Sequence, residues 1–430
     1  MVYFSQPRAF CGESAQEEPP LSLNIINEAR RCLNCKNPSC RKGCPISTPI
    51  PEVIRLFLDG EIDKAGEILF ENNPLSMICS LICNQENQCE GHCILSKKNA
   101  PVLFGNIENY ISDAYFSKID FGNIEKNGMK VGVIGSGPAG ITIAIILARK
   151  GYDITLFESR EKIGGVLRYG IPEFRLPKRN IERYKDLLLS LGIKIRPNTS
   201  IGFPITIDDL FRDGYKAIFI GTGVWRPNTL KIKGESLGNV HFAINYLTNP
   251  DVYMLGSTLN IIGAGNSAMD VARTALRHGC SKVTVFSRSE RIAASVTEVE
   301  LAKIDGVQFV HGVEPVEITD EGTIFVQVER DSEGNKKRVE GSERLYPASS
   351  TIIAVSQGPR DRIVSTTKGI DVNDRGLLVT NTYGKTTREG IFGAGDVVLG
   401  ARTVVEAVNY SKQVAEAMHE YLQSLKPTEN

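Results

Sequence analysis

The chain is 430 residues long, has 50 Lys plus Arg against 50 Asp plus Glu, and is 41% hydrophobic. This length predicts roughly two to four domains rather than a single core. The balanced charge excludes the basic field that attracts nucleic acids or anionic membranes, and the longest apolar run is far shorter than the ~20 residues of a membrane span. The N-terminus lacks the charged start and apolar core of a secretion signal. We therefore expect a cytoplasmic protein without nucleic-acid or membrane partners.

The first residues of the chain differ in pattern from those that follow. Residues 1–22 have no periodic apolar pattern, so a loose terminus is expected there, and Cys11 within it has no partner at ligand spacing. Residues 24–35, 50–60 and 63–73 have the character of helices, and the last two place apolar side chains at three- and four-residue steps. This front segment is therefore predicted to be all-α.

Cysteine usage is the most unusual feature of the composition. Eight of the ten cysteines lie in one short segment, and in a chain without a secretion signal such a group is more often a metal site than a disulfide framework. The first group has the spacing Cys-x2-Cys-x4-Cys-x3-Cys-Pro, and the second has Cys-x3-Cys-x5-Cys-x3-Cys. The groups are Cys32, Cys35, Cys40 and Cys44, then Cys79, Cys83, Cys89 and Cys93.

The Cys-Pro that closes the first group is typical of ferredoxins, in which the last cysteine of the run ligates the other cluster. Cys32, Cys35 and Cys40 would then hold one 4Fe-4S cluster, whose fourth ligand would come from the second group. Cys44 would instead bind a second cluster, together with other members of the second group. Two structural zinc sites are the alternative, because thiolates at these spacings also suit tetrahedral zinc. An x4 gap followed by Cys-Pro is, however, not typical of zinc knuckles.

Glu108 lies in a helical pattern shortly after the second cysteine group. A carboxylate can replace a thiolate on iron, which makes this residue a candidate ligand. The spacing alone favours a solvated acid on a helix, so both interpretations stay open.

Residues 130–140 read KVGVIGSGPAG, an apolar strand that runs through a glycine turn into a helical pattern. In a dinucleotide-binding fold the first glycine allows the sharp turn, the second lets the backbone approach a pyrophosphate, and the third lets the helix pack on the strand. An acid about 20 residues later binds a ribose hydroxyl. The predicted binding residues are Gly135, Ser136, Gly137, Pro138, Ala139 and Gly140 in the turn, and Glu158 as the acid.

Residues 164–178 form a proline-bounded loop with paired glycines, before a helical pattern at 180–192. Gly165, Arg168 and Arg175 are its candidate cofactor contacts, because this rigid loop could lie beside a ring and a pyrophosphate. A plain loop without a ligand explains the same residues equally well.

A second glycine turn follows the apolar strand that ends at Ile262. Its candidate nucleotide contacts are Gly263, Ala264, Gly265, Asn266 and Ser267. The next strand, near 282–287, ends without an acid and is followed by Arg288 and Arg291. A 2′-phosphate is bound by arginine where NAD's ribose would take a carboxylate, so the pattern favours NADP(H). Two solvated surface arginines are the alternative.

The last part of the chain completes the sheets. Segments 307–312 and 322–331, with a polar turn at 332–337, predict an antiparallel sheet. Gly395 and Asp396 follow a strand and precede the helix that starts at Thr403, where they could address the ribityl chain and pyrophosphate of a flavin. The simpler interpretation of Asp396 is a helix N-cap.

Two glycine fingerprints, the GGVLRYGIPEFRLP loop, the closing GAGD motif and the eight-cysteine segment cover nearly the whole chain. Together they resemble the small subunit of NADPH-dependent glutamate synthase, and they are similar to the N-terminal half of dihydropyrimidine dehydrogenase and its bacterial subunit. The resemblance implies an α/β fold with an all-α iron–sulfur domain and two Rossmann-like domains, the NADPH domain being inserted in the FAD domain. The implied domains are 1–127 with two 4Fe-4S clusters, 128–250 and 355–430 for FAD, and 251–354 for NADPH.

The same resemblance implies roles for individual residues. FAD would lie at the first glycine turn with Glu158, Arg175 and Asp396, and NADPH would take Gly265, Asn266, Ser267 and Arg288. Ser289 stands where some family members have a second arginine after Arg288. This difference leaves open whether the chain prefers NADPH or NADH. One cluster would take Cys32, Cys35, Cys40 and Cys93, and the other Cys44, Cys83, Cys89 and Glu108, with Cys79 spare.

Hydride transfer between nicotinamide and flavin needs stacked rings more than an acid or base, so no catalytic side chain is expected. Electrons would then pass singly through the two clusters to a partner subunit, because no second catalytic domain is left in the chain. The implied function is an NADPH-dependent oxidoreductase subunit of the glutamate synthase type. Dihydropyrimidine dehydrogenase and bifurcating transhydrogenase complexes share the module and are alternatives. A non-catalytic iron–sulfur sensor or scaffold is another, against which two intact phosphate turns argue.

Overall fold

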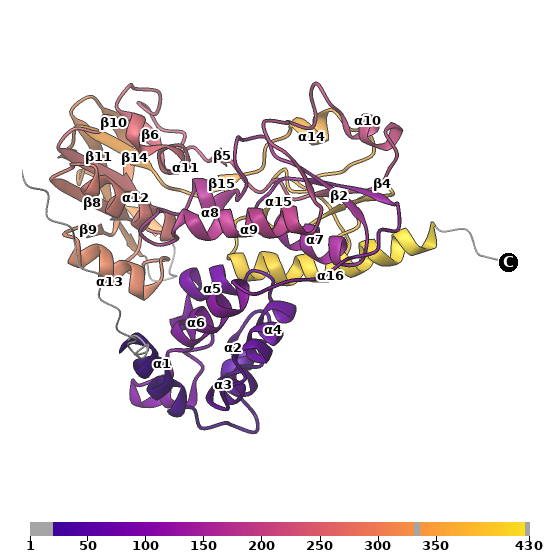
Figure 1. Cartoon of the computed structure of the whole chain (residues 1–430). Helices are drawn as coiled ribbons and strands as arrows, with labels where there is room; N and C mark the ends of the chain where they lie inside the picture. The colour runs from indigo at the N-terminus through magenta and orange to yellow at the C-terminus, as the bar shows by residue number, and fades with distance from the viewer. Residues whose placement is uncertain (1–19, 331–335, 426–430) are drawn as a thin grey trace, which may run out of the picture.

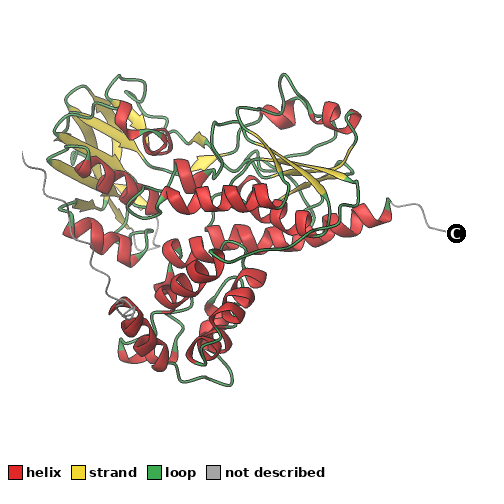
Figure 2. Ribbon diagram, viewed as in Figure 1, coloured by secondary structure: helices red, strands yellow, loops and turns green. Residues whose placement is uncertain are grey.

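The computed structural model describes residues 20–330 and 336–425, which form three lobes (Figure 1). One lobe contains only helices, and the other two contain parallel sheets covered by helices (Figure 2). The expected loose terminus, with Cys11, lies outside the described residues except for 20–22, which begin α1. Within the described ranges no helix is long and apolar enough to cross a membrane.

The helical lobe confirms the all-α prediction for the front segment. Its helices bury their apolar faces in one core, to which Val53, Leu69 and Ile107 contribute from three different helices. The elements are α1 (Pro20–Arg30), α2 (Ser39–Gly43), α3 (Ile50–Leu58), α4 (Ile62–Asn72), α5 (Ser76–Ile82), η1 (Gln85–Asn87), η2 (Ile94–Lys98) and α6 (Phe104–Phe116).

The first α/β lobe has five parallel strands in the order β16-β4-β1-β2-β3. Because β1 has β2 on one side and β4 on the other, the order reverses at β1, and ligands bind at the carboxyl ends of strands at such a point. The strands are β1 (Lys130–Ile134), β2 (Asp153–Phe157), β3 (Lys194–Arg196), β4 (Tyr215–Ile220) and β16 (Ile391–Gly393). The helices are α7 (Pro138–Arg149), α8 (Val166–Tyr169), α9 (Lys178–Ser190), α10 (Ile207–Arg212), α14 (Arg362–Ser365), α15 (Asp396–Leu399) and α16 (Val404–Ser424).

The second α/β lobe repeats this plan with parallel strands in the order β6-β14-β7-β8-β9. It is inserted between β4 and β16 of the first sheet, as the fold-class prediction requires. The strands are β6 (Val240–Phe242), β7 (Thr258–Ile262), β8 (Lys282–Ser287), β9 (Gln308–His311) and β14 (Ser350–Ile353). The helices are α11 (Ala243–Thr248), η3 (Pro250–Val252), α12 (Asn266–Arg277) and α13 (Val296–Ile304).

An antiparallel sheet packs on the second lobe, and a short two-stranded ribbon joins the two α/β lobes. The sheet consists of β10 (Val313–Thr319), β11 (Gly322–Arg330), β12 (Lys336–Arg338) and β13 (Arg344–Pro347). The ribbon consists of β5 (Arg226–Pro227) and β15 (Gln357–Gly358), paired antiparallel. The chain therefore passes between the lobes twice, at adjacent points.

Two sequence-based expectations need correction here. Strand β9 was expected in the antiparallel sheet, but it pairs in parallel with β8, because its apolar side chains extend the core of the parallel sheet. The expected boundary at residue 251 also comes too late, since β6 pairs with β14 and α11 packs in the second core. The predicted turn at 332–337 falls mostly on 331–335, outside the described residues.

Candidate cofactor sites

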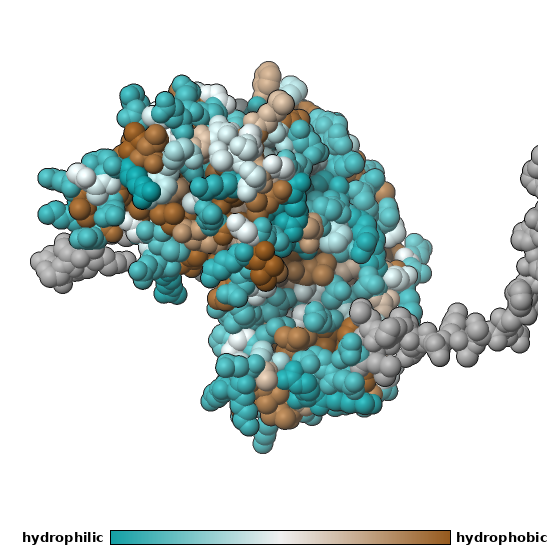
Figure 3. Space-filling model, turned by 90° about the vertical axis from the view of Figure 1, so that its left-hand side faces the viewer, coloured by the Kyte–Doolittle hydropathy of each residue, from teal (hydrophilic) through white to brown (hydrophobic). Residues whose placement is uncertain are grey.

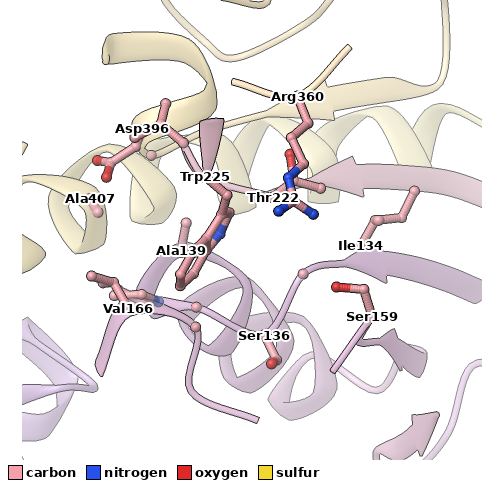
Figure 4. A pocket seen from close by; sticks show the side chains of 18 of the residues that line it. Ile134, Ser136, Ala139, Ser159, Val166, Thr222, Trp225, Arg360, Asp396 and Ala407 are labelled. Atoms are coloured by element: carbon pink, nitrogen blue, oxygen red, sulfur yellow. The ribbon is translucent and has the colours of Figure 1, made fainter. Parts of the chain in front are cut away.

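A cavity of about 530 Å³ lies where the two α/β lobes face each other, at the carboxyl ends of β1 and β4. Most of its lining comes from the first lobe, and Ile244 and Ser267 come from α11 and α12 of the second. Figure 4 shows Ser136, Ala139, Trp225, Arg360 and Asp396 around this space. The first glycine turn therefore lines the cavity directly, and Ser267, at the start of the helix that follows the second turn, reaches it from the other lobe.

The first glycine turn has the geometry that a pyrophosphate needs. Gly135 has a φ of 97°, and a Cβ there would lie 2.6 Å from the Gly221 carbonyl oxygen. A Cβ on Gly140 would collide with the Gly135 carbonyl oxygen, so Gly140 packs the helix on the turn and does not line the cavity. Helix α7 has Gly137 as its N-cap, without a side-chain hydrogen bond, so its N-terminal amides are left for a ligand at the cavity.

Glu158 lies beside this turn and is almost fully buried. Its carboxylate accepts hydrogen bonds from the Ser136 amide at 3.1 Å, from the Ser136 hydroxyl, and from the Arg160 amide at 2.8 Å. These bonds fix the acid at the end of β2, against the cavity. This is the position from which a ribose hydroxyl is bound in dinucleotide-binding folds.

The closing motif places Gly395, Asp396 and Thr403 on the same cavity. Burial raises the pKa of Asp396 to about 6, and its carboxylate accepts a hydrogen bond from the Arg402 amide at 3.2 Å. Thr403 caps α16 with Glu406 in a reciprocal capping box, so the simple N-cap interpretation applies to Thr403 rather than to Asp396. Asp396 remains available as an acceptor for a hydroxyl.

Arg160, Trp225 and Arg360 are among the large side chains on the cavity that were not singled out from the sequence. The Arg160 guanidinium lies 4.2 Å from the ring centroid of Trp225 and 4.3 Å from that of Tyr169, so the arginine joins two aromatic faces. Trp225 is the only tryptophan of the chain and directly precedes β5. No sequence motif marks these three residues, although the Gly221-Thr222-Gly223 segment just before Trp225 ends a strand of the parallel sheet, where ligands bind.

The loop 164–178 behaves differently from the expectation. A Cβ on Gly165, whose φ is 51°, would lie 2.7 Å from the Gly137 Cα, so this glycine does lie against the phosphate turn. Arg168 bonds the Ile163 carbonyl and pairs with Glu182 inside its own lobe. Arg175 pairs with Asp270 and Glu298 of the second lobe. Neither arginine lines the cavity, because nearby carboxylates already bind both guanidinium groups.

The second glycine turn repeats the geometry of the first. Gly263 has a φ of 117°, and Gly265 is the N-cap of α12, without a side-chain bond and with open space where a Cβ would be. The backbone amides of Ala293 and Ala294 donate to the Ala264 carbonyl. The segment after β8 therefore folds back over the turn.

Asn266 and Ser267 begin α12, and their roles differ. The Asn266 side chain accepts a hydrogen bond from the Ser295 amide at 2.9 Å, so it is engaged in the fold, whereas Ser267 faces the shared cavity. Arg288 and Arg291 lie on the exposed segment after β8, and within the described residues neither side chain has a hydrogen bond or ion pair. Within the described residues, two cations without a partner therefore follow β8, whose end lies beside the second glycine turn.

The cysteines divide into two spatial groups that do not follow the order of the chain. A separate cavity of about 100 Å³ in the helical lobe is lined by the first three cysteines of the first group and by the last two of the second. No disulfide forms among the described cysteines. These five residues are Cys32, Cys35, Cys40, Cys89 and Cys93.

Cys44, Cys83 and Glu108 lie near Cys89, which the two groups share, and Cys44 and Cys83 also pack against the core of the first α/β lobe. Burial raises the pKa of Cys89, and the nearby Glu108 and Cys44 raise it further. Glu108 also contributes to the raised pKa of Cys83. Cys79 lies next to Cys83 and is hydrogen-bonded to it, so the structure places both candidates for the last ligand at the same place. Burial raises the pKa of Glu108 well above its ordinary value, and the nearby Cys79 and Glu90 raise it further.

The donor set fits iron–sulfur clusters better than single zinc ions. In the part of the chain that the structure describes, no three His, Cys, Asp or Glu side chains converge on one metal position, as a zinc ion with bonds of ~2.3 Å would require. A cluster instead spreads its ligands around several irons. Glu108 is free to be a ligand in this donor set, because its buried carboxyl has no hydrogen bond or ion pair within the described residues.

Comparison with known proteins agrees with this arrangement. The family described as pyridine nucleotide-disulphide oxidoreductase matches residues 129–419, and that described as dihydropyrimidine dehydrogenase domain II, 4Fe-4S cluster, matches residues 14–119. The Mycobacterium tuberculosis protein FprA in complex with NADPH is similar in fold, with a TM-score of 0.59 and 17% identity over 69% of this chain and 85% of that one.

Two relatives are similar over almost their whole length. The glutamate synthase [NADPH] small chain of Escherichia coli K12 is 31% identical over 92% of this chain and 91% of its own. The NAD-dependent dihydropyrimidine dehydrogenase subunit PreT of the same organism is 32% identical over 94% of this chain and 95% of its own. The chain thus belongs to the pyridine nucleotide-disulphide oxidoreductase family and is a flavoprotein oxidoreductase with a 4Fe-4S domain, of the glutamate synthase small-chain type.

Proposed function

We propose that the chain is the electron-input subunit of a glutamate synthase-type complex, which takes a hydride from NADPH onto FAD and passes single electrons through two 4Fe-4S clusters to a larger subunit. The observation that carries this proposal is the shared cavity. The first glycine turn lines it, and Ser267 at the start of α12 reaches it from the second lobe, so one dinucleotide held at each helix start would bring its reactive ring toward the same space. We infer that the first lobe holds FAD and the second NADPH.

The residues of the first lobe fit FAD. The amides at the start of α7 would bind the pyrophosphate, Glu158 a ribose hydroxyl, and Asp396 a hydroxyl of the ribityl chain. Gly137 and Gly165 have no side chains, which leaves room for the pyrophosphate to come close to the backbone. When bound, the flavin supplies the conversion of a two-electron hydride into single electrons. The protein's part is to position the two cofactors and enclose them. Hydride transfer between them requires no acid or base on the cavity.

The helical lobe fits the next steps because its second ligand group lies nearer the FAD lobe. Met77, Ile78 and Cys79 of α5 belong to the core of the FAD lobe, and Cys44 and Cys83 pack against that core. Cys32, Cys40 and Cys93 pack only in the core of the helical lobe. We infer that Cys44, Cys83, Cys89 and Glu108 would hold the cluster nearer the flavin, and Cys32, Cys35, Cys40 and Cys93 the farther one.

The partner and the limits of the domains also belong to the proposal. The relatives are named as a small chain and as a subunit, which favours a larger partner that uses the electrons. We place the helical domain at 1–127 and the return to the FAD domain at 355, with the NADPH domain starting near β6. The dihydropyrimidine dehydrogenase type is the second candidate, because PreT is as similar as the glutamate synthase small chain.

Anaerobic reduction by NADPH tests the proposal. Adding NADPH to the purified holoprotein should bleach the flavin absorbance and then produce a low-temperature electron paramagnetic resonance signal of a reduced cluster. Flavin that stays oxidised, or flavin reduction without any cluster signal even with a stronger reductant, would contradict it. Co-purification of a glutamate synthase large subunit or of a pyrimidine-reducing subunit separates the two candidates.

A further inference from the structure

Six charged side chains form one network where the two α/β lobes meet. Arg175, from the loop before α9, binds both carboxylate oxygens of Asp270 at 2.9 Å and Glu298 at 2.8 Å. Arg273 binds the other oxygen of Glu298 at 2.8 Å and Asp305 at 3.0 Å, and Arg277 binds Asp305 at 2.7 Å. Only Arg175 of these six comes from the first lobe, so among the described residues it alone carries ion pairs between the two α/β lobes.

The part of the network around Arg175 is buried, which distinguishes it from ordinary surface ion pairs. The side chains of Arg175, Asp270 and Glu298 are 13%, 5% and 10% exposed. Phe174, next to Arg175, lies 4.7 Å and 4.3 Å from the guanidinium groups of Arg273 and Arg277. A guanidinium held by two buried carboxylates has a defined direction, and removing it leaves buried charges without a partner.

Both acids that bind Arg175 are connected to the nucleotide turn of the second lobe. Asp270 lies on α12 three residues after Ser267, so the two side chains are on one face of the helix, about one turn apart. Glu298 lies on α13, whose N-cap Ser295 donates its amide to Asn266 at 2.9 Å. Ser267 lines the shared cavity. Arg175 therefore holds the start of α12 from two sides.

We propose that Arg175 is a positioning residue for hydride transfer: through Asp270 and Glu298 it fixes the nucleotide turn of the second lobe over the flavin cavity and so sets where the nicotinamide ring lies. This inference rests on the proposed function. The two chain crossings near β5 and β15 form only a narrow ribbon, so the relative position of the lobes depends on contacts such as this one. Arg175 does not line the shared cavity and acts through α12 and α13.

The test compares Arg175→Met, which keeps the aliphatic length but removes the charge, with Arg175→Lys and Asp270→Asn. Arg388→Met is the matched control, because Arg388 is a part-buried arginine that pairs with Asp208 inside the FAD lobe. Stopped-flow reduction of the holoprotein gives the limiting rate of flavin reduction and the dissociation constant of NADPH separately. Hydrogen exchange measured without NADPH reports the position of the lobes independently of activity.

For Arg175→Met the limiting rate should fall by roughly tenfold to a hundredfold, as expected when reacting rings shift by about 1 Å. The NADPH dissociation constant should stay within about threefold of the wild-type value, because no ligand contact is lost. The flavin content should equal that of the wild type. Exchange should speed up only in 172–178, α12 and α13. Arg175→Lys should recover part of the rate, since an ammonium cannot bridge both carboxylates as the guanidinium does.

Three outcomes would overturn the inference. They are a limiting rate within about twofold of the wild type in Arg175→Met, an equal fall in Arg388→Met, and loss of flavin from Arg175→Met, Arg175→Lys and Asp270→Asn alike. The last would show a role in folding rather than in positioning. If NADPH fails to reduce the wild-type flavin, the proposed function is wrong, whereas hydrogen exchange in the variants still decides whether Arg175 holds the lobes together.

Discussion

Arg288 offers the sharpest prediction about nucleotide choice. It follows β8, is exposed, and within the described residues has no hydrogen bond or ion pair, so it is free to meet a phosphate. A charge-assisted contact contributes about 1.5 to 3 kcal/mol, and a tenfold change in affinity corresponds to about 1.4 kcal/mol. We expect Arg288→Ala to weaken NADPH binding by about tenfold to a hundredfold.

The assay is the dissociation constant of each nucleotide from anaerobic flavin reduction, measured for NADPH and NADH at one ionic strength. NADH, which has no 2′-phosphate, should bind Arg288→Ala and the wild type nearly equally. Lys282→Ala is the control, because Lys282 is an exposed cation at the opposite end of the same strand. Equal losses for NADPH and NADH in Arg288→Ala, or an equal NADPH loss in Lys282→Ala, would refute the reasoning.

Three further predictions concern the clusters, the phosphate turn and pH. Glu108→Ala should shift or destabilise one cluster, whereas Cys79→Ser should keep both clusters. Iron content and electron paramagnetic resonance measure this, and the reverse pattern would show that Cys79 is the ligand. Gly165→Ala should lose FAD, because its Cβ would lie 2.7 Å from the Gly137 backbone, whereas Gly238→Ala, with open space around it, should retain FAD on purification. Burial lowers the pKa of Lys178 to about 8 from its ordinary 10.5, so the native state loses this proton first. Stability relative to Lys178→Met should therefore rise by up to about 3 kcal/mol between pH 8 and 10; a pH-independent difference in thermal midpoints would disprove this.

The glycine turns could be predicted from the sequence because they are local. Gly135 and Gly263 each end a strand and precede a helix within a few residues, and the reason for each glycine lies in its own backbone angle. The clustering of cysteines was equally visible. The insertion of the second lobe in the first was implied by the resemblance to the glutamate synthase small-subunit family, and the order of the strands in the two sheets agrees with it.

What the sequence left hidden depends on partners far away in the chain. Arg175 resembles a flavin contact by its position in a glycine-rich loop, but its partner Asp270 lies 95 residues later and only the fold brings them together. Trp225 faces the cavity because β4 ends there, and no motif marks it. Strand β6 was missed for a similar reason, since its membership in the second sheet is set by β14, more than 100 residues further on.

The most direct test of the central claim is the metal content of the anaerobically purified chain, with iron and zinc measured on the same sample. Two 4Fe-4S clusters, held by Cys32, Cys35, Cys40 and Cys93 and by Cys44, Cys83, Cys89 and Glu108, predict about eight irons per chain and little zinc. Close to two zinc ions per chain with little iron would contradict the account.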